Sequence, residues 1–169
     1  YQKLSAPGVL EKFEKAWGTK LNPKEGTKAT ECFGKMLTKE IRGLFIFGED
    51  PVRTDPDTAH VMKALKNLDF LVMDELFLTE TAKMADVVLP GRSYAEKEGT
   101  FSNTERRVQR IRKAVEIEGE TKEDIWIFTE IMNRMGYPQP HLTSAQVMDE
   151  VASVTPSFAG ISHERLDSE

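Results

Sequence analysis

Acidic residues follow two short apolar runs of this chain, at positions where they could bind a polar ligand. Asp74 and Glu75 come directly after the apolar run 70–73, and Gly48 and Asp50 follow an earlier run. A carboxylate can accept paired hydrogen bonds from a guanine edge or a ribose, and a glycine lets a ligand approach the backbone closely. From the residues alone, a plain turn at Gly48 to Asp50 and a solvated acidic pair are the favoured interpretations.

Four further polar residues lie downstream, and each has a structural role beside a possible binding one. Thr79 and Thr81 open the next predicted helix, where hydroxyls and free backbone N–H groups could hold a phosphate or cap the helix. Lys97 stands between two acids and could donate to a phosphate or form a surface ion pair of little energy. Asp124 begins the strongest helical pattern of the chain, where a carboxylate offsets the helix dipole.

Alternating helical and strand patterns predict the elements that would position these residues. Continuous apolar runs predict buried strands at 43–47, 70–73 and 87–89. Helical spacing predicts helices at 9–17, 30–38, 124–135 and 143–151, with another begun by Asp55 and Pro56. A β-α-β-α-β series is typical of a parallel sheet whose strands deliver their carboxyl ends to one crevice. We therefore predict an α/β fold, a three-layer, mainly parallel, Rossmann-like sheet with flanking helices.

The rest of the chain is less regular. Residues 100–115 are predicted to form an extended, strand-like segment or a loop, and the tail after Thr155 to be loosely ordered. This extended stretch carries a basic run in an otherwise acidic chain, made of Arg106, Arg107, Arg110, Arg112 and Lys113. The run could form an anion site or contact an acidic neighbour. Pairing within the chain, with Glu116, Glu118 and Glu120, is the favoured interpretation.

The composition is that of an ordinary globular domain. A length of 169 residues with 39% hydrophobic and 30% charged residues suits one core. The net charge of −5 disfavours a nucleic-acid surface. A single cysteine, Cys32, excludes an internal disulfide, and three scattered histidines give no metal-ligand pattern. No pairing of a nucleophile with a base is evident either, so we predict no catalytic and no metal-binding residue.

The ends and the hydropathy of the chain bear on its location. No apolar run approaches the ~20 residues that span a bilayer. The first residues lack the basic and apolar regions of a signal peptide. We therefore expect a cytoplasmic chain without a membrane span. It begins at Tyr1 rather than Met, which is consistent with a segment excised from a longer protein.

Three motifs in series resemble those of the molybdopterin oxidoreductase family. They are GEDP at 48–51, TETAKMADVVLP at 79–90 and EKEGTFSNTERRVQ at 96–109. The resemblance covers essentially the whole chain and is closest to an internal domain of the catalytic (alpha) subunit of formate dehydrogenases, with periplasmic-type nitrate reductases as more distant relatives. It implies that the chain is one piece of a much larger subunit.

The resemblance also implies roles for the candidate residues. In relatives, the position of Asp50 is often asparagine and lies against the pterin, and the acids matching Asp74 and Glu75 contact the guanine dinucleotide. The matching lysine supports a role for Lys97 as a donor to a phosphate or pterin group, and the acid matching Asp124 also touches the cofactor. With Gly48 and Thr79, these residues make up the predicted cofactor-binding set.

By resemblance, the parent subunit would oxidise formate to carbon dioxide at molybdenum or tungsten held by two molybdopterin guanine dinucleotides. A 4Fe-4S cluster outside this stretch would carry the electrons away. The metal ligand and the four-cysteine cluster motif are not among these residues, so the fragment alone should be inactive and bind no cofactor. Its expected partners are the remaining domains of the parent and the electron-transfer subunits, with no nucleic acid.

The predicted organisation is a helical lead-in at 1–40, an α/β cofactor-cradle domain at 41–135, and a C-terminal helix and tail at 136–169. Two alternatives remain open at this point. One is a stand-alone α/β interaction or regulatory module without cofactor, because fold alone does not settle function. The other is the same domain from a nitrate reductase-like enzyme. A nicotinamide-binding domain is disfavoured, because no G-x-G-x-x-G follows any strand.

Overall fold

The computed structural model describes residues 2–117 and 119–168, which fold into two compact units. The first, here called the hairpin unit, comprises Tyr1–Gly26, Glu98–Arg112 and Pro140–Glu169. The second, here called the sheet unit, comprises Thr27–Lys97 and Lys113–Gln139. Among the described residues, no helix is long and apolar enough to cross a membrane.

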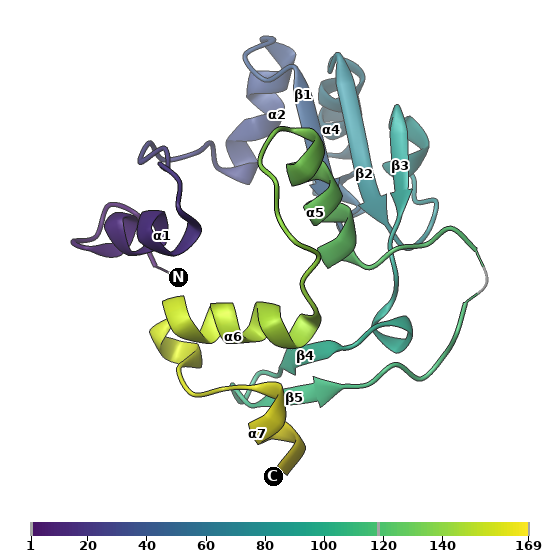
Figure 1. The fold of residues 1–169 in the computed structure, drawn as a ribbon. Helices are drawn as coiled ribbons and strands as arrows, with labels where there is room; N and C mark the ends of the chain where they lie inside the picture. The colour runs from purple at the N-terminus through teal and green to yellow at the C-terminus, as the bar shows by residue number, and fades with distance from the viewer. Residues whose placement is uncertain (1, 118, 169) are drawn as a thin grey trace. The chain divides into compact units, whose positions relative to one another are not determined.

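A parallel three-stranded sheet forms the centre of the sheet unit, with strand order β1-β2-β3 (Figure 1). The strands are β1 at Gly43–Phe47, β2 at Phe70–Glu75 and β3 at Val87–Pro90. Phe47 lies opposite Asp74, which in turn lies opposite Leu89. Because β2 is paired on both sides through Asp74, the strand continues into the acidic residues. The prediction that β2 ends at Met73 was therefore wrong by two residues.

The two faces of the sheet are covered by different helices, which gives three layers. Side chains alternate along a strand, so Leu71 and Met73 share one face. That face packs against α2 at Ala29–Leu37 and α4 at Thr58–Lys66, and both side chains are almost fully buried. On the other face, the ring of Phe128 in α5 at Asp124–Arg134 lies 5.1 Å from the ring of Phe47. The predicted three-layer α/β fold with a parallel sheet is confirmed.

The connections of the sheet differ from the prediction in two places. The segment between β2 and β3 contains only one 3-10 turn, η1 at Ala82–Met84, where a full helix was expected. The N-cap of α4 is Asp57, whose side chain accepts from the His60 N–H, and not Asp55. Asp55 instead accepts from the backbone of Asp57, because it lies in a turn after the short helix α3 at Pro51–Thr54.

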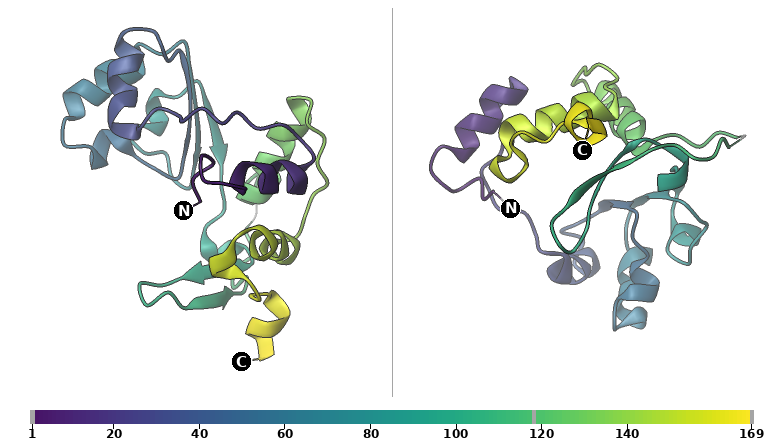
Figure 2. Two further views of the ribbon diagram at one scale, coloured as in Figure 1. Left: turned by 90° about the vertical axis from the view of Figure 1, so that its left-hand side faces the viewer. Right: turned by 90° about the horizontal axis from the view of Figure 1, so that it is seen from below.

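The hairpin unit is built on an antiparallel ribbon. Strand β4 at Gly99–Ser102 pairs with β5 at Val108–Ile111, and Figure 2 shows this ribbon from two further sides. The unit also holds α1 at Val9–Trp17, α6 at Ser144–Val154, η3 at Pro156–Phe158 and α7 at His163–Ser168. The expectation of a loosely ordered tail was wrong, because η3 packs against α6 and α7 packs against β5.

Ion pairs with α7 explain why the tail is ordered. Arg110 and Arg112 both contact Asp167, at 3.1 Å and 2.5 Å. The expected pairing of the basic run with the acids that follow it is found only between Lys113 and Glu116 among the described residues. Glu118, one of the expected partners, lies outside the described residues.

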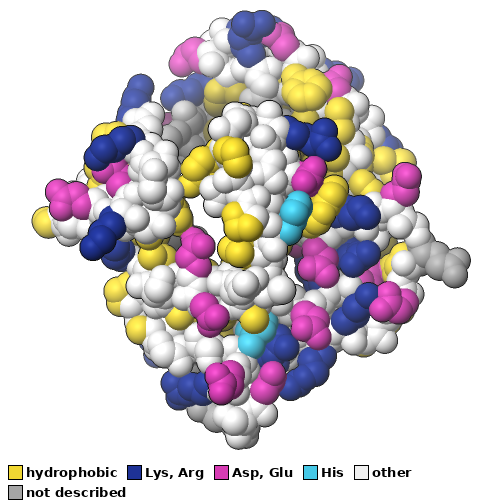
Figure 3. Space-filling view, in the orientation of Figure 1, with side chains coloured by type: hydrophobic (Ala, Val, Ile, Leu, Met, Phe, Trp, Pro, Cys, Tyr) yellow, Lys and Arg dark blue, Asp and Glu magenta, His cyan; other side chains and the backbone are white. Residues whose placement is uncertain are grey.

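Several large apolar side chains remain exposed, and hydrophobic side chains are visible at the surface in Figure 3. The clearest case is the loop after β2, where Phe77 is 76% exposed and Leu78 is 65% exposed. Contiguous exposed apolar residues of this kind are typical of surfaces that contact other protein.

Candidate functional site

A buried carboxylate without a full set of partners marks the candidate site. Asp74 in β2 is only 1% exposed, and its side chain projects from the sheet face opposite Leu71 and Met73. Among the described residues, its Oδ2 atom has no hydrogen-bond partner. Buried polar atoms are almost always paired, because an unpaired one loses its hydration without compensation. The Asp74 Oδ2 atom is therefore placed to accept a hydrogen bond from a donor that the described part of the chain does not supply.

Gly91, directly after β3, brings a second carboxylate to the same place. A Cβ atom at Gly91 would lie 2.8 Å from Asp74 Oδ1 and 3.3 Å from Asp124 Oδ1. The Gly91 N–H donates to the carbonyl of Glu75 at 3.1 Å, which fixes the glycine against the end of β2. Only a glycine fits here without displacing a carboxylate. The two acids thus lie together across a glycine that sequence reasoning missed.

Lys97 completes this group. Its Nζ atom is hydrogen-bonded to Asp124 Oδ2, and both side chains are about three-quarters buried, with exposed fractions of 27% and 22%. We refer to Asp74, Gly91, Lys97 and Asp124 as the carboxylate cluster. It draws on the ends of β2 and β3, the segment after η2 at Tyr94–Glu96, and the start of α5 at Asp124–Arg134.

The electrostatics of the carboxylate cluster favour a ligand rich in N–H or O–H donors. Burial, together with the negative charge of the neighbouring Asp124, raises the pKa of Asp74 from 3.8 to about 6. The ammonium of Lys97 acts in the opposite direction on that pKa. Two carboxylates facing one cation leave an excess of hydrogen-bond acceptors. A ligand donor near Asp74 would relieve this excess, because it stabilises the ionised form.

Asp50 belongs to a separate cluster on the loops that follow β1 and β2. The backbone N–H and the hydroxyl of Thr81 both donate to Asp50 Oδ1, at 3.2 Å and 2.5 Å. Thr81 is fully buried, and its hydroxyl oxygen accepts from the backbone N–H of Val52 at 3.1 Å. These contacts tie the two loops together at the carboxyl edge of the sheet. One Asp50 oxygen is therefore already occupied within the chain.

The other predicted site residues have local roles in the structure. Gly48 has a φ of 59° and donates its N–H to the carbonyl of Asp74 at 2.9 Å. Glu75 Oε1 accepts from the N–H of Leu76 at 2.7 Å. Thr79 Oγ1 accepts from the N–H of Ala82 at 3.2 Å. Because η1 is a single turn, the helix N-terminus expected at Thr79 to hold a phosphate is not formed.

A family model and individual relatives both match this chain, and they point to the same family. Residues 9–134 match the model of the molybdopterin oxidoreductase family. The chain is 49% identical over 168 residues to the F420-dependent formate dehydrogenase subunit alpha of Methanocaldococcus jannaschii, covering 98% of this chain and 24% of that protein. It is 44% identical to a putative formate dehydrogenase of Staphylococcus aureus, covering 99% of this chain and 17% of that protein.

A solved structure supports the same relationship. Acetylene hydratase from Pelobacter acetylenicus superposes with a TM-score of 0.67 at 25% identity, over 99% of this chain and 24% of that chain. The chain therefore spans about a quarter or less of the length of the proteins to which it is compared here.

Proposed function

The chain belongs to the molybdopterin oxidoreductase family, and we propose that it forms part of the cofactor cradle of a formate dehydrogenase-type subunit. In this proposal the parent subunit oxidises formate to carbon dioxide and passes the electrons to a 4Fe-4S cluster held outside this stretch. When bound, a molybdenum or tungsten ion held by two molybdopterin guanine dinucleotides supplies the redox chemistry. The residues of this chain bind and orient the cofactor, and none of them is catalytic.

The observation that carries the proposal is the buried Oδ2 atom of Asp74, to which no residue that the structure describes donates a hydrogen bond. Guanine presents N–H donors on its pairing edge, and a carboxylate accepts such donors in pairs. Asp74 would therefore bind the guanine of one dinucleotide, with Glu75 as the neighbouring acceptor. Because Gly91 has no side chain, it approaches both carboxylates closely without displacing either of them.

The remaining predicted residues fit supporting roles in the same cradle. Lys97 is held by Asp124 and offers further ammonium hydrogens to a phosphate or pterin oxygen. Asp124 holds this lysine in place and is a further acceptor. Gly48 and Asp50 lie at the carboxyl edge of β1, where we place the pterin end, and Thr79 offers a hydroxyl in the loop after β2. The domain boundaries at 41–135 stay a prediction.

A test uses the full-length parent subunit with Asp74→Asn, which keeps the shape of the side chain but replaces one acceptor oxygen by an amide donor. Asp69→Asn is the matched control, because Asp69 lies at the other end of β2 and pairs with Lys39 and Arg42. The readouts are metal content and guanine nucleotide released per purified subunit. We expect at least about tenfold less of both in Asp74→Asn, since a charged hydrogen bond is lost and a donor faces a donor. Equal loading of the two variants would refute the proposed role of Asp74.

The partners in this proposal are the other domains of the parent subunit and its electron-transfer subunits. The exposed apolar loop at Phe77 and Leu78 is suited to such a contact, since it would be covered in a longer chain. The names of the similar proteins favour formate over nitrate as substrate, because formate dehydrogenases recur among them.

A further inference from the structure

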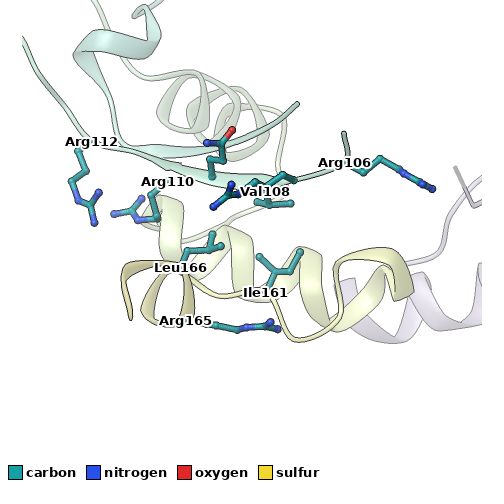
Figure 4. Close-up of a pocket in the computed structure, with 9 residues that line it drawn as sticks. Arg106, Val108, Arg110, Arg112, Ile161, Arg165 and Leu166 are labelled. Atoms are coloured by element: carbon teal, nitrogen blue, oxygen red, sulfur yellow. The ribbon is translucent and has the colours of Figure 1, made fainter. Parts of the chain in front are cut away.

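An arginine-rich cavity of about 390 Å³ lies in the hairpin unit. Five arginines line it: Arg106, Arg107, Arg110, Arg112 and Arg165. No acidic side chain is among the described residues that line it. Figure 4 shows Arg110 and Arg112 on the β5 side and Arg165 on the α7 side, with Ile161 and Leu166 between them. Every residue of this cavity belongs to the hairpin unit, whereas the carboxylate cluster belongs to the sheet unit.

Two of these arginines are held in place by acids behind the cavity. The Arg110 side chain is only 9% exposed and contacts Asp167 and Glu98, at 3.1 Å and 3.6 Å. Its Nη1 atom also donates to the carbonyl of Gly99 at 2.9 Å. Arg112 shares Asp167 with it. A nearly buried guanidinium with several partners is preorganised, so it can present its remaining N–H groups without losing further side-chain entropy.

Two other arginines of the cavity, Arg106 and Arg107, carry charges that no acid among the described residues balances. For Arg106 and Arg107, the described part of the chain provides no ion pair to either guanidinium group. The loop that carries them is fixed by Asn103, whose side chain accepts from the Arg107 N–H at 3.0 Å and whose carbonyl accepts from the Arg106 N–H at 2.9 Å. These two charges stand out because the chain as a whole has a net charge of −5.

The backbone of Arg106 gives a second, independent observation. Its φ of 64° lies in the left-handed region that glycine and asparagine adopt readily and that other residues avoid. A glycine would suit this hairpin loop better. A strained arginine at a loop tip therefore indicates that its side chain is used for something other than the stability of the hairpin.

We propose that this cavity binds a small phosphorylated anion that carries at least two negative charges, such as a pyrophosphate group. Arginine forks match phosphate oxygens in pairs, and arginine is the only basic residue type that lines the cavity. The volume falls within the range of small-molecule sites. The apolar floor formed by Val108, Ile161 and Leu166 gives the non-phosphate part of such a ligand a surface to pack on.

The test measures binding of pyrophosphate, orthophosphate and poly-glutamate to the 169-residue chain by isothermal titration calorimetry at low salt. The wild-type chain is expected to bind pyrophosphate more tightly than orthophosphate. In Arg106→Gly, the affinity for pyrophosphate should fall about tenfold or more, because a charged hydrogen bond is lost. The midpoint of thermal unfolding of this variant should stay equal or rise, since the left-handed strain is relieved. Arg53→Gln, which changes an exposed arginine of the sheet unit, should leave the affinity unchanged.

Three outcomes would overturn the proposal. One is the absence of pyrophosphate binding by the wild-type chain. Another is an unchanged affinity in Arg106→Gly together with a lower unfolding midpoint, which would make the arginine a structural element of the loop. The third is binding of poly-glutamate without binding of pyrophosphate, which would identify the cavity as a contact for an acidic protein segment.

Discussion

Replacing Asp74 by asparagine should stabilise the isolated chain at neutral pH. The pKa of Asp74 is raised from 3.8 to about 6, mainly by burial, so ionisation of this group opposes folding. Between these two values the folded state binds more protons than the unfolded state, and stability therefore falls as the pH rises through that window. A difference of about 2 pKa units corresponds to about 3 kcal/mol at pH 7. Asp74→Asn removes this penalty and should gain about 1–3 kcal/mol there, shrinking to a few tenths at pH 4.

Urea unfolding of the wild-type chain and Asp74→Asn at a series of pH values from 4 to 8 measures this difference directly. Asp69→Asn is the control, because the pKa of Asp69 is shifted in the opposite direction. Hydrogen bonds from Lys39 and Arg42 lower this pKa, so removing the Asp69 carboxylate should bring no gain in stability at neutral pH. Two results would refute this reasoning: a lower free energy of unfolding for Asp74→Asn than for the wild type at pH 7, or the same increase at every pH. Either would mean that ionisation of Asp74 does not oppose folding.

Four further predictions test the contacts around the sheet and the hairpin. Gly91→Ala should lower the free energy of unfolding by about 1–3 kcal/mol, because its Cβ would lie 2.8 Å from Asp74 Oδ1, whereas Gly99→Ala, with open space around it, should lose nothing in the same denaturant titration. Thr81→Val should lose about 1–3 kcal/mol in that assay, since it removes the bonds to Asp50 and Val52 in a buried place, and Thr79→Val should lose less. Lys97→Met should raise the pKa of Asp74 further, because the ammonium lowers it, and an NMR titration of the Asp74 carboxyl carbon would detect the shift. Burial and the neighbouring Arg110 lower the pKa of His163 below its ordinary value of 6.5. The wild-type chain should therefore lose stability as the pH falls below 6.5, because the unfolded state then binds a proton more readily than the folded state. The unfolding midpoint of His163→Asn should not show this decrease.

The sheet and most helices could be predicted from the sequence because apolar spacing reports burial directly. The strands β1 and β3 and the helices α1, α2 and α5 lie within about a residue of the expected positions, since each is bounded by glycine, proline or charged residues. The expected end of β2 was wrong because it depends on the neighbouring strands and not on the local pattern. Pairing with these strands carries β2 into Asp74 and Glu75.

The hairpin unit was harder to predict because its order depends on distant charges. Arg110 and Arg112 meet Asp167 from the far end of the chain, and this contact orders both β5 and α7. In the sequence, the nearer acids at 116–120 offered a simpler set of partners. The role of Gly91 was hidden for the same reason, because a glycine after a strand is an ordinary turn until Asp74 and Asp124 are seen to lie beside it.

Asp74 and Asp50 carry different weight as evidence for a binding role. Asp50 accepts two hydrogen bonds from Thr81, so the fold alone is a sufficient reason for an acid there. Asp74 is buried, one of its oxygens has no partner within residues 2–117 and 119–168, and its ionised form is disfavoured by its surroundings. The stability of this chain therefore gives no reason to retain an aspartate there. Proteins keep residues that oppose folding where function requires them. A donor bound at Asp74 therefore requires that Asp74→Asn both stabilise the chain and empty the cradle of its cofactor.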